Sequence, residues 1–174
     1  MIFRNFLILN LVFFFNSGVF AVNIRVLDFQ KIIENNKNLS LFYDQIKEDQ
    51  DSYKNEFKTE ELNLQNEYKR IEELNLILDP NELDNEIEKY NIKLNDFNSK
   101  IQKFNLHYET QINNFKNKII NITLEILKQY SDANKIDLIL DSNNYVLSSN
   151  SINITELIED KVNNIKMEIN IEKY

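Results

Sequence analysis

Apolar residues recur every three or four positions along two long stretches of this chain. In the first stretch they are Leu39, Phe42, Ile46, Tyr53, Phe57, Leu64, Tyr68, Ile71, Leu74 and Leu78. This spacing predicts a helix with one apolar face that needs a partner. Polar residues interrupt the stripe near Asp49 and Glu60, so we expect this helix to be an imperfect one.

The second stretch is more regular than the first. Steps of four and three residues alternate along Leu83, Ile87, Tyr90, Leu94, Phe97, Ile101, Phe104 and Tyr108. This heptad spacing is typical of a helix in a left-handed coiled coil. A second four-residue step, from Tyr108 to Ile112, is a stutter that locally unwinds the supercoil, and we expect the arm to flex there. The stripe then continues through Phe115, Ile119, Ile122, Ile126 and Tyr130.

Asp79-Pro80-Asn81 separates the two stretches. Proline lacks an amide donor and disfavours helical geometry at the residue before it, so the first helix should stop here. Asp79 can cap the second helix, with Pro80 at its first position. The sequence therefore predicts an antiparallel helical hairpin over residues 39–132 with its turn at 79–81. The alternative is a parallel dimeric coiled coil interrupted at Pro80.

Shorter elements flank the hairpin. Residues 23–29 alternate as a strand does, and a helical pattern starts at Gln30. Residues 135–141 and 145–149 indicate two further strands around a turn, which could form a β-hairpin. A final helix follows, with Asn153 and Glu156 at capping-box spacing. Its expected apolar stripe is Ile154, Ile158, Val162, Ile165 and Ile169.

Residues 22–38 and 133–174 are therefore expected to form a small β-rich body at the base of the hairpin. The predicted fold class is α+β: a long coiled-coil hairpin on a small β body with a C-terminal helix. Such a body buries little apolar surface, and its edge strands are open to pairing. We therefore expect several copies to associate through it.

Residues 1–21 have the pattern of a secretory signal peptide. Arg4 precedes an apolar run, Phe6 to Phe15, and Val19-Phe20-Ala21 supplies small residues for cleavage after Ala21. The run is shorter than the ~20 apolar residues that a membrane-spanning helix needs. An uncleaved membrane anchor is the alternative to secretion.

The rest of the chain contains few residue types that carry chemistry. After residue 21 there is no Gly or Cys, and His107 is the one histidine. Phosphate-binding loops and nucleophile elbows need glycine, whereas disulfides and cysteine zinc sites need cysteine. His107 lies in the second helical stretch, beside the stripe, and we expect an ordinary surface histidine. We predict no enzyme and no catalytic, cofactor-binding or metal-ligating residue.

Charge excludes a further class of partner. Residues 1–21 carry only Arg4, so the net charge of the remaining chain is −9, one below the −8 of the whole chain. A chain this acidic is a poor ligand for nucleic acid, whose affinity comes from neutralised phosphates. It is also a poor general binder of anionic membranes.

Three short motifs carry a family resemblance. They are Val26-Leu27-Asp28-Phe29-Gln30-Lys31-Ile32-Ile33, Ile136-Asp137-Leu138-Ile139-Leu140-Asp141 and Ser151-Ile152-Asn153-Ile154-Thr155-Glu156-Leu157-Ile158. Together with the signal and the helical hairpin, their order resembles the Skp/OmpH family of periplasmic chaperones. The last motif is similar to that family's serine-x-aspartate-isoleucine-threonine stretch, with Asn153 in place of the aspartate. The resemblance covers essentially all of the chain after the signal.

The resemblance implies a homotrimer in the periplasm. Strands of three subunits would build the body, and three hairpins would project as tentacles around a cavity that holds unfolded outer-membrane proteins. No ATP and no catalysis would be involved. One feature departs from the family, whose best-known members are basic. Residues 70–89, around the expected tip, carry seven acidic side chains and two basic ones. This does not favour contact of the tip with a membrane or lipopolysaccharide.

A chaperone of this kind needs apolar surface that its own fold does not bury. Leu62, Leu76, Ile77, Ile92 and Leu106 lie off the apolar stripes and are the candidate client contacts. Leu62 and Leu76 are fourteen residues apart, as are Ile92 and Leu106, and two heptads would place each pair on one helix face. Scattered exposed aliphatic residues are the alternative interpretation. The competing function is a structural envelope protein, a coiled-coil spacer or stalk without chaperone activity.

Overall fold

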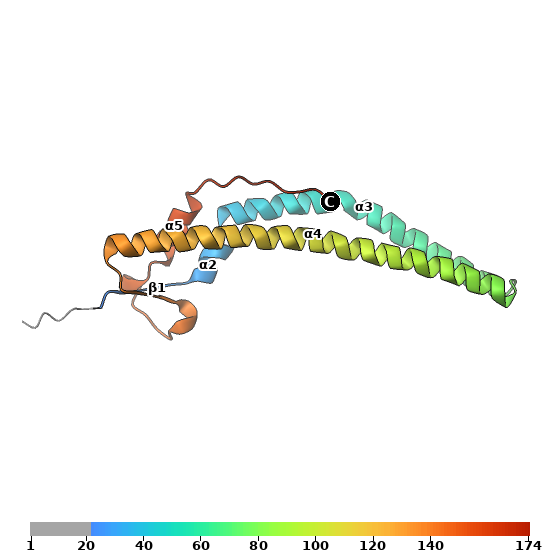
Figure 1. Ribbon diagram of the computed structural model, residues 1–174, viewed down its shortest axis with the longest axis horizontal. Coiled ribbons are helices and arrows are strands. Elements are labelled where there is room, and N and C mark those ends of the chain that lie inside the picture. Colours follow the sequence, from blue (N-terminus) through green and yellow to red (C-terminus); the bar gives the residue numbers. More distant parts are fainter. Residues whose placement is uncertain (1–21) are drawn as a thin grey trace, which may run out of the picture.

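The computed structural model describes residues 22–174, so the expected signal peptide lies outside the described residues. Two long helices, α3 (Lys37–Leu74) and α4 (Pro80–Asn134), lie side by side and run in opposite directions. Together they project from a small body (Figure 1). With 55 residues, α4 is roughly 80 Å long at about 1.5 Å per residue. The antiparallel hairpin is confirmed within one chain.

The two apolar stripes face each other and form the core of the hairpin. We call the buried line between α3 and α4 the seam. Near the body it is dense, and the rings of Phe42 and Phe115 stack with their centroids 4.2 Å apart. Towards the tip it thins, because every residue of α4 from Pro80 to Lys103 is at least partly exposed. Buried seam residues are Leu39, Phe42, Ile46, Leu64, Ile71, Phe104, Tyr108, Phe115, Ile119 and Leu127.

Polar pairs fill the two interruptions in the first apolar stripe. The carboxylate of Asp49 is buried and accepts a hydrogen bond of 2.5 Å from the hydroxyl of Tyr108. Near Glu60, the ammonium group of Lys100 reaches two carboxylates of α3 at 2.8 and 2.9 Å. The buried pair of Asp49 and Tyr108 is satisfied in only one register of the helices, and the more exposed contacts of Lys100 fit the same alignment.

The turn of the hairpin lies before Pro80 rather than around it. Helix α3 ends at Leu74, residues 75–79 make the turn, and Pro80 is the first residue of α4. Asp79 caps α4 as expected, accepting hydrogen bonds from the backbone N–H groups of Asn81 and Glu82 at 2.9 and 3.1 Å. The expected turn at 79–81 is therefore displaced, because proline starts a helix without losing an intrahelical hydrogen bond.

The body contains two strands instead of the three expected. Strand β1 (Ile24–Leu27) pairs in parallel with β2 (Leu138–Asp141), with Ile24 opposite Leu138. The pair is parallel because the whole hairpin serves as the crossover between its strands. The strand expected over 145–149 is wrong, and so is the β-hairpin. The short 3₁₀ helix η1 (Ser142–Asn144) follows β2 directly, and Asn153 makes an isolated bridge to Val26.

Side chains of the three end motifs tie the body together. Asp28 caps the short helix α2 (Phe29–Glu34) by accepting from the N–H of Lys31. Asp141 accepts from the N–H of Phe29 at 3.0 Å. The hydroxyl of Thr155 accepts from the N–H of Asp28 at 2.9 Å. The second and third motifs thus each satisfy a backbone group of the first, while Asp28 satisfies one within its own motif.

The last helix is shorter than predicted. Helix α5 (Thr155–Asn163) follows the short 3₁₀ helix η2 (Asn150–Ile152) and ends before Ile165, so the helix expected through Ile169 is wrong in its second half. The capping box is also wrong in detail, because Asn153 accepts from the N–H of Thr155 instead of Glu156. After α5, apolar residues occur at every second position, which is the period of a strand and not of a helix. Residues 165–174, which we call the strap, run extended along the hairpin (Figure 1).

The buried hydrogen bond between Asp49 and Tyr108 should be measurable as stability. Burial, and then the hydrogen bond to Asp49, raise the pKa of the Tyr108 phenol above its usual range, so the phenol stays a donor. Tyr108→Phe leaves the Asp49 carboxylate without this donor and should lower the free energy of unfolding by about 1–3 kcal/mol. Urea denaturation measures this change. Tyr90→Phe, at a half-buried seam tyrosine packed on Tyr68, is the control and should change stability by less than ~0.5 kcal/mol.

Candidate functional site

All five candidate contact residues are exposed on the hairpin. Leu62 lies on α3, Ile92 and Leu106 lie on α4, and Leu76 and Ile77 lie in the turn. The two turn residues are 88% and 79% exposed, against 47–59% for the three on helices. The expected common face of Leu62 and Leu76 is wrong, because α3 ends before Leu76. The turn instead presents Leu76 and Ile77 together at the far end of the molecule.

Ile92 and Leu106 do share a helix face. They are fourteen residues apart on α4, and both lie on the side away from the seam. Leu124, half exposed and a further eighteen residues along, continues the same face because eighteen residues are five helical turns. We call Ile92, Leu106 and Leu124 the outer row. The sequence analysis missed Leu124, although this spacing could have indicated it.

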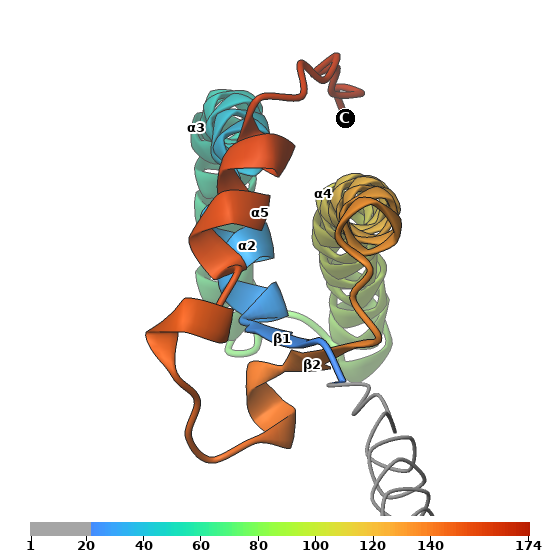
Figure 2. The same ribbon diagram turned by 90° about the vertical axis from the view of Figure 1, so that its left-hand side faces the viewer.

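A second surface lies where the strap crosses the hairpin. The strap passes over the line along which α3 and α4 meet (Figure 2). Met167, Ile169 and Ile171 are half-buried against the hairpin core, whereas the four polar residues between and beside them are exposed. We call the surface of the hairpin under the strap, which includes Tyr53, Phe57, Phe104, His107 and Gln111, the groove. The sequence analysis did not anticipate it.

Hydrogen bonds hold the strap by its backbone. Gln111 accepts from the N–H of Glu172 at 2.7 Å and donates to its carbonyl at 2.9 Å. The Nε2 atom of His107 lies 2.7 Å from the same carbonyl. The hydroxyl of Tyr53 donates to the carbonyl of Tyr174 at 2.5 Å. The sequence analysis expected His107 to be an ordinary surface histidine. In the structure it is part of the contact between the hairpin and the strap.

Aromatic rings form the floor of the groove. The ring of Phe104 meets those of Phe57 and Tyr108 edge to face, with centroids 4.8 and 5.0 Å apart. The ring of Tyr174 completes this cluster, 5.1 Å from Phe104 and 5.8 Å from Tyr53. Edge-to-face packing of this kind is adaptable in detail and still buries much apolar area.

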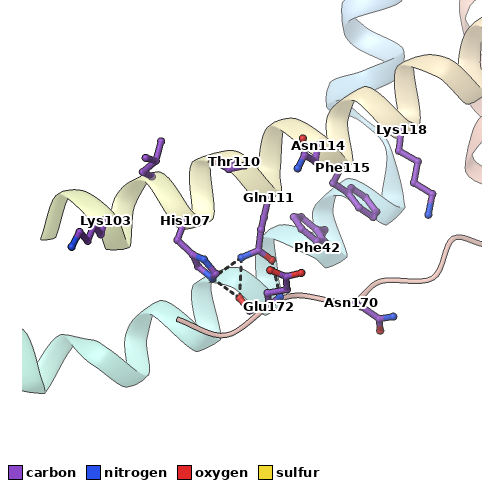
Figure 3. Close-up of a pocket in the computed structure, with 11 residues that line it drawn as sticks. Phe42, Lys103, His107, Thr110, Gln111, Asn114, Phe115, Lys118, Asn170 and Glu172 are labelled. Carbon is purple, nitrogen blue, oxygen red and sulfur yellow. Dashed lines mark hydrogen bonds between the residues drawn. The ribbon is translucent and has the colours of Figure 1, made fainter. Parts of the chain in front are cut away.

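An open cavity of about 560 Å³ lies beside the strap (Figure 3). The close-up shows His107, Gln111 and Glu172 joined by hydrogen bonds, with Lys103 and Lys118 spaced along α4 on either side of them. Leu106 of the outer row also lines this cavity. The strap groove and one candidate contact residue therefore belong to a continuous surface.

The tip of the hairpin keeps its acidic character. Its two basic residues, Arg70 and Lys89, both pair with Glu86 at 2.6 and 2.8 Å. The hydrogen bonds from Lys89 and then from Arg70 lower the pKa of this carboxyl. The remaining acidic residues of the tip add to a net negative charge: Glu72, Glu73, Asp79, Glu82, Asp84 and Glu88.

Other kinds of site were searched for over residues 22–174. No three His, Asp or Glu side chains in this range are grouped closely enough to hold a metal ion. Within the same range, no helix is both long enough and apolar enough to cross a membrane.

Comparison with known proteins places these features in context. Residues 23–162 match the family model described as outer membrane protein (OmpH-like). A crystal structure described as an OmpH-like outer membrane chaperone from Caulobacter crescentus CB15 superposes with a TM-score of 0.68 at 16% sequence identity. The match covers 90% of this chain and 94% of that one, so the two share a fold. No curated protein matches the chain.

Loss of Gln111 should loosen the strap. Gln111→Ala removes both hydrogen bonds to Glu172, and a net loss of ~1 kcal/mol corresponds to a roughly fivefold faster exchange of the Glu172 amide. Hydrogen–deuterium exchange followed by NMR measures this rate. Gln129→Ala, on the same helix but bonded only to Glu125, is the matched control and should leave it unchanged. Equal rates in both variants would contradict the described docking of the strap.

Proposed function

The chain belongs to the OmpH-like family of outer membrane proteins, and we propose that it is an ATP-independent holdase chaperone for unfolded outer-membrane proteins in the periplasm. The signal pattern of residues 1–21 supports export. Binding alone, without catalysis, would keep clients from aggregating. The observation that carries the proposal is the row of exposed aliphatic side chains on a long hairpin that does not bury them itself.

The outer row provides the apolar surface that a holdase needs. Ile92, Leu106 and Leu124 are each more than half exposed, although side chains of this kind gain ~1.5–3 kcal/mol when fully buried. Leu62 on α3 and the turn residues Leu76 and Ile77 add apolar surface along the same arm. Contacts spread along an arm suit an unfolded client, which offers many weak apolar segments rather than one shaped surface.

Association of three copies through the body is the second part of the proposal. The sheet of one chain has two short strands, and isolated pairs of this kind are marginal in water. Val146 and Leu147 are almost completely exposed in the loop after η1, and Leu138 of β2 is 45% exposed. Burial of this loop and of the outer edge of β2 by neighbouring copies would bring three arms around one cavity.

The acidic tip argues against a lipid-binding role for this end of the arm. Its basic residues are already paired with Glu86, so they do not offer free positive charge to anionic headgroups. Client capture would therefore depend on apolar contacts more than on charge. A spacer or stalk would need the same hairpin, whereas client binding would also use the aliphatic residues exposed along it.

The outer row should determine client affinity. Ile92→Ser combined with Leu106→Ser should weaken binding of an unfolded outer-membrane protein on the order of tenfold or more, because two apolar contacts are lost. Suppression of light scattering by a diluted, urea-unfolded porin measures holdase activity, and fluorescence titration measures affinity. A wild-type chain that leaves porin aggregation unchanged would refute the chaperone function and favour the spacer.

The loop after η1 should determine assembly. Val146→Ser combined with Leu147→Ser should reduce the mass found by light scattering from that of an oligomer to that of a single chain, because the lost burial opens the interface. The Ile92→Ser/Leu106→Ser variant is the reciprocal control, since it should keep the oligomer and lose client affinity. An unchanged mass after substitution of the loop would show that the copies associate elsewhere.

A further inference from the structure

The strap has the pattern of a β-strand that lies on an apolar surface. Ile165, Met167, Ile169 and Ile171 alternate with Lys166, Glu168, Asn170 and Glu172. The alternation is also seen in burial, since the apolar side chains at 167, 169 and 171 pack against the core. A segment of about ten residues with alternating hydrophobicity is likewise the unit from which transmembrane β-barrels are built.

Most hydrogen bonds between the strap and the hairpin involve backbone groups of the strap. Asn38 donates to the carbonyl of Ile165 at 3.1 Å, near the start of the strap. Gln111 binds both backbone groups of Glu172, as a neighbouring strand would, and Tyr53 binds the carbonyl of Tyr174. Backbone groups are the same in every sequence, so these donors and acceptors would fit any extended segment of similar alternation.

The floor of the groove is apolar and aromatic. It consists of the aromatic cluster around Phe104, together with the side chains of α3 and α4 on either side. The apolar side chains at 167, 169 and 171 pack against the hairpin core, and the ring of Tyr174, which is outside that alternation, packs on the aromatic cluster itself. The one side-chain hydrogen bond from the strap to the hairpin runs from the hydroxyl of Tyr174 to the carbonyl of Lys100, and at 3.3 Å it is long.

We propose that the strap occupies, in the absence of a client, a site that binds client segments. The groove beneath it would bind extended, alternating strand segments of unfolded outer-membrane proteins, and the strap would leave before such a segment docks. This inference rests on the chaperone function proposed above and adds a defined subsite and a pattern to it. The structure favours a client strand over a second copy of this chain, because the strap already reaches the groove of its own hairpin.

Competition of this kind has a predictable size. A short tether gives the strap an effective concentration in the millimolar range at its own groove. A free segment at micromolar concentration would therefore bind only to the fraction of molecules whose strap is undocked. Weakening the strap should raise the affinity for a free segment by on the order of tenfold or more.

The experiment uses the full chain and a fluorescent ten-residue peptide with the sequence of residues 165–174. Ile169→Ser/Ile171→Ser weakens strap docking without a change in charge. Lys166→Ser/Glu168→Ser is the matched control, since it alters two exposed strap residues and also leaves the net charge unchanged. Fluorescence anisotropy should show that the first variant binds the peptide at least tenfold more tightly than the wild type and the control. A scrambled peptide of equal composition should bind all three weakly.

Three results would overturn the inference. Equal peptide affinity of the three proteins would mean that the strap does not cover a binding groove. Equal affinity for the scrambled peptide would mean a general apolar surface without strand preference. A lower mass of the Ile169→Ser/Ile171→Ser variant in light scattering would mean that the strap joins copies. Porin aggregation is measured in parallel: its suppression together with any of these results refutes the subsite alone, whereas its absence refutes the chaperone function.

Discussion

The hairpin has only one surface on which to bury apolar side chains, and the rest of the structure follows from this constraint. Two helices share a single seam, so each aliphatic residue either lies in that seam or remains exposed unless a third segment covers it. The seam is dense near the body, where Phe42 stacks on Phe115, and thin towards the tip. A third layer covers the half of the hairpin next to the body, where α2, α5 and the strap pack, and the strap reaches Lys100 in the middle of the arm. The far half of the arm therefore presents its off-seam residues to the surroundings.

Register in such a seam is specified by its few polar positions. Apolar stripes with a heptad period can slide past one another by whole heptads at moderate cost, whereas a buried carboxylate is satisfied in one alignment. The buried Asp49 accepts a hydrogen bond from Tyr108, and the more exposed carboxylates of Glu56 and Glu60 pair with Lys100 in the same alignment. What appears in the sequence as a defect of the first helix is, in the structure, a pair of contacts that align the two arms. The aligned arms in turn bring Gln111 and Tyr53 to the same groove.

The sequence predicted those parts of the molecule whose pattern is long and local. The hairpin follows from some forty residues of periodicity on each side of Pro80, and the capping role of Asp79 follows from its neighbours. Errors occurred where a short pattern has two interpretations. Val146 and Leu147 resemble a strand, but one chain supplies no surface for them to cover. Ile165 and Ile169 are four residues apart, which fits a helix, whereas Met167 and Ile171 between and after them fit a strand. Burial against the hairpin decides in favour of the extended form.

The same distinction explains why the exposed aliphatic residues of the arm were predictable and the groove was not. Leu62, Ile92 and Leu106 could be identified by subtraction, because they are the aliphatic residues left over by the stripes. The groove could be predicted only by knowing that the last ten residues return to the middle of the arm. There Glu172 contacts Gln111, more than sixty residues away in the sequence. No local pattern encodes such a pairing. His107 shows the limit well, since its place beside the stripe is visible in the sequence but its partner is not.

A strap held mainly by backbone groups and three half-buried side chains is also suited to being displaced. Its hydrogen bonds and the partial burial of its apolar side chains stabilise docking, and the entropy of ordering ten residues opposes it. The docked form therefore has only a small net advantage. Under the proposed function, a client with several alternating segments would bind the groove and the outer row at once, and such multivalent contact would exceed what one tethered segment provides. The strap would thus protect the aromatic floor from water and from other copies while the arm is empty, and would give way to a client without any source of chemical energy.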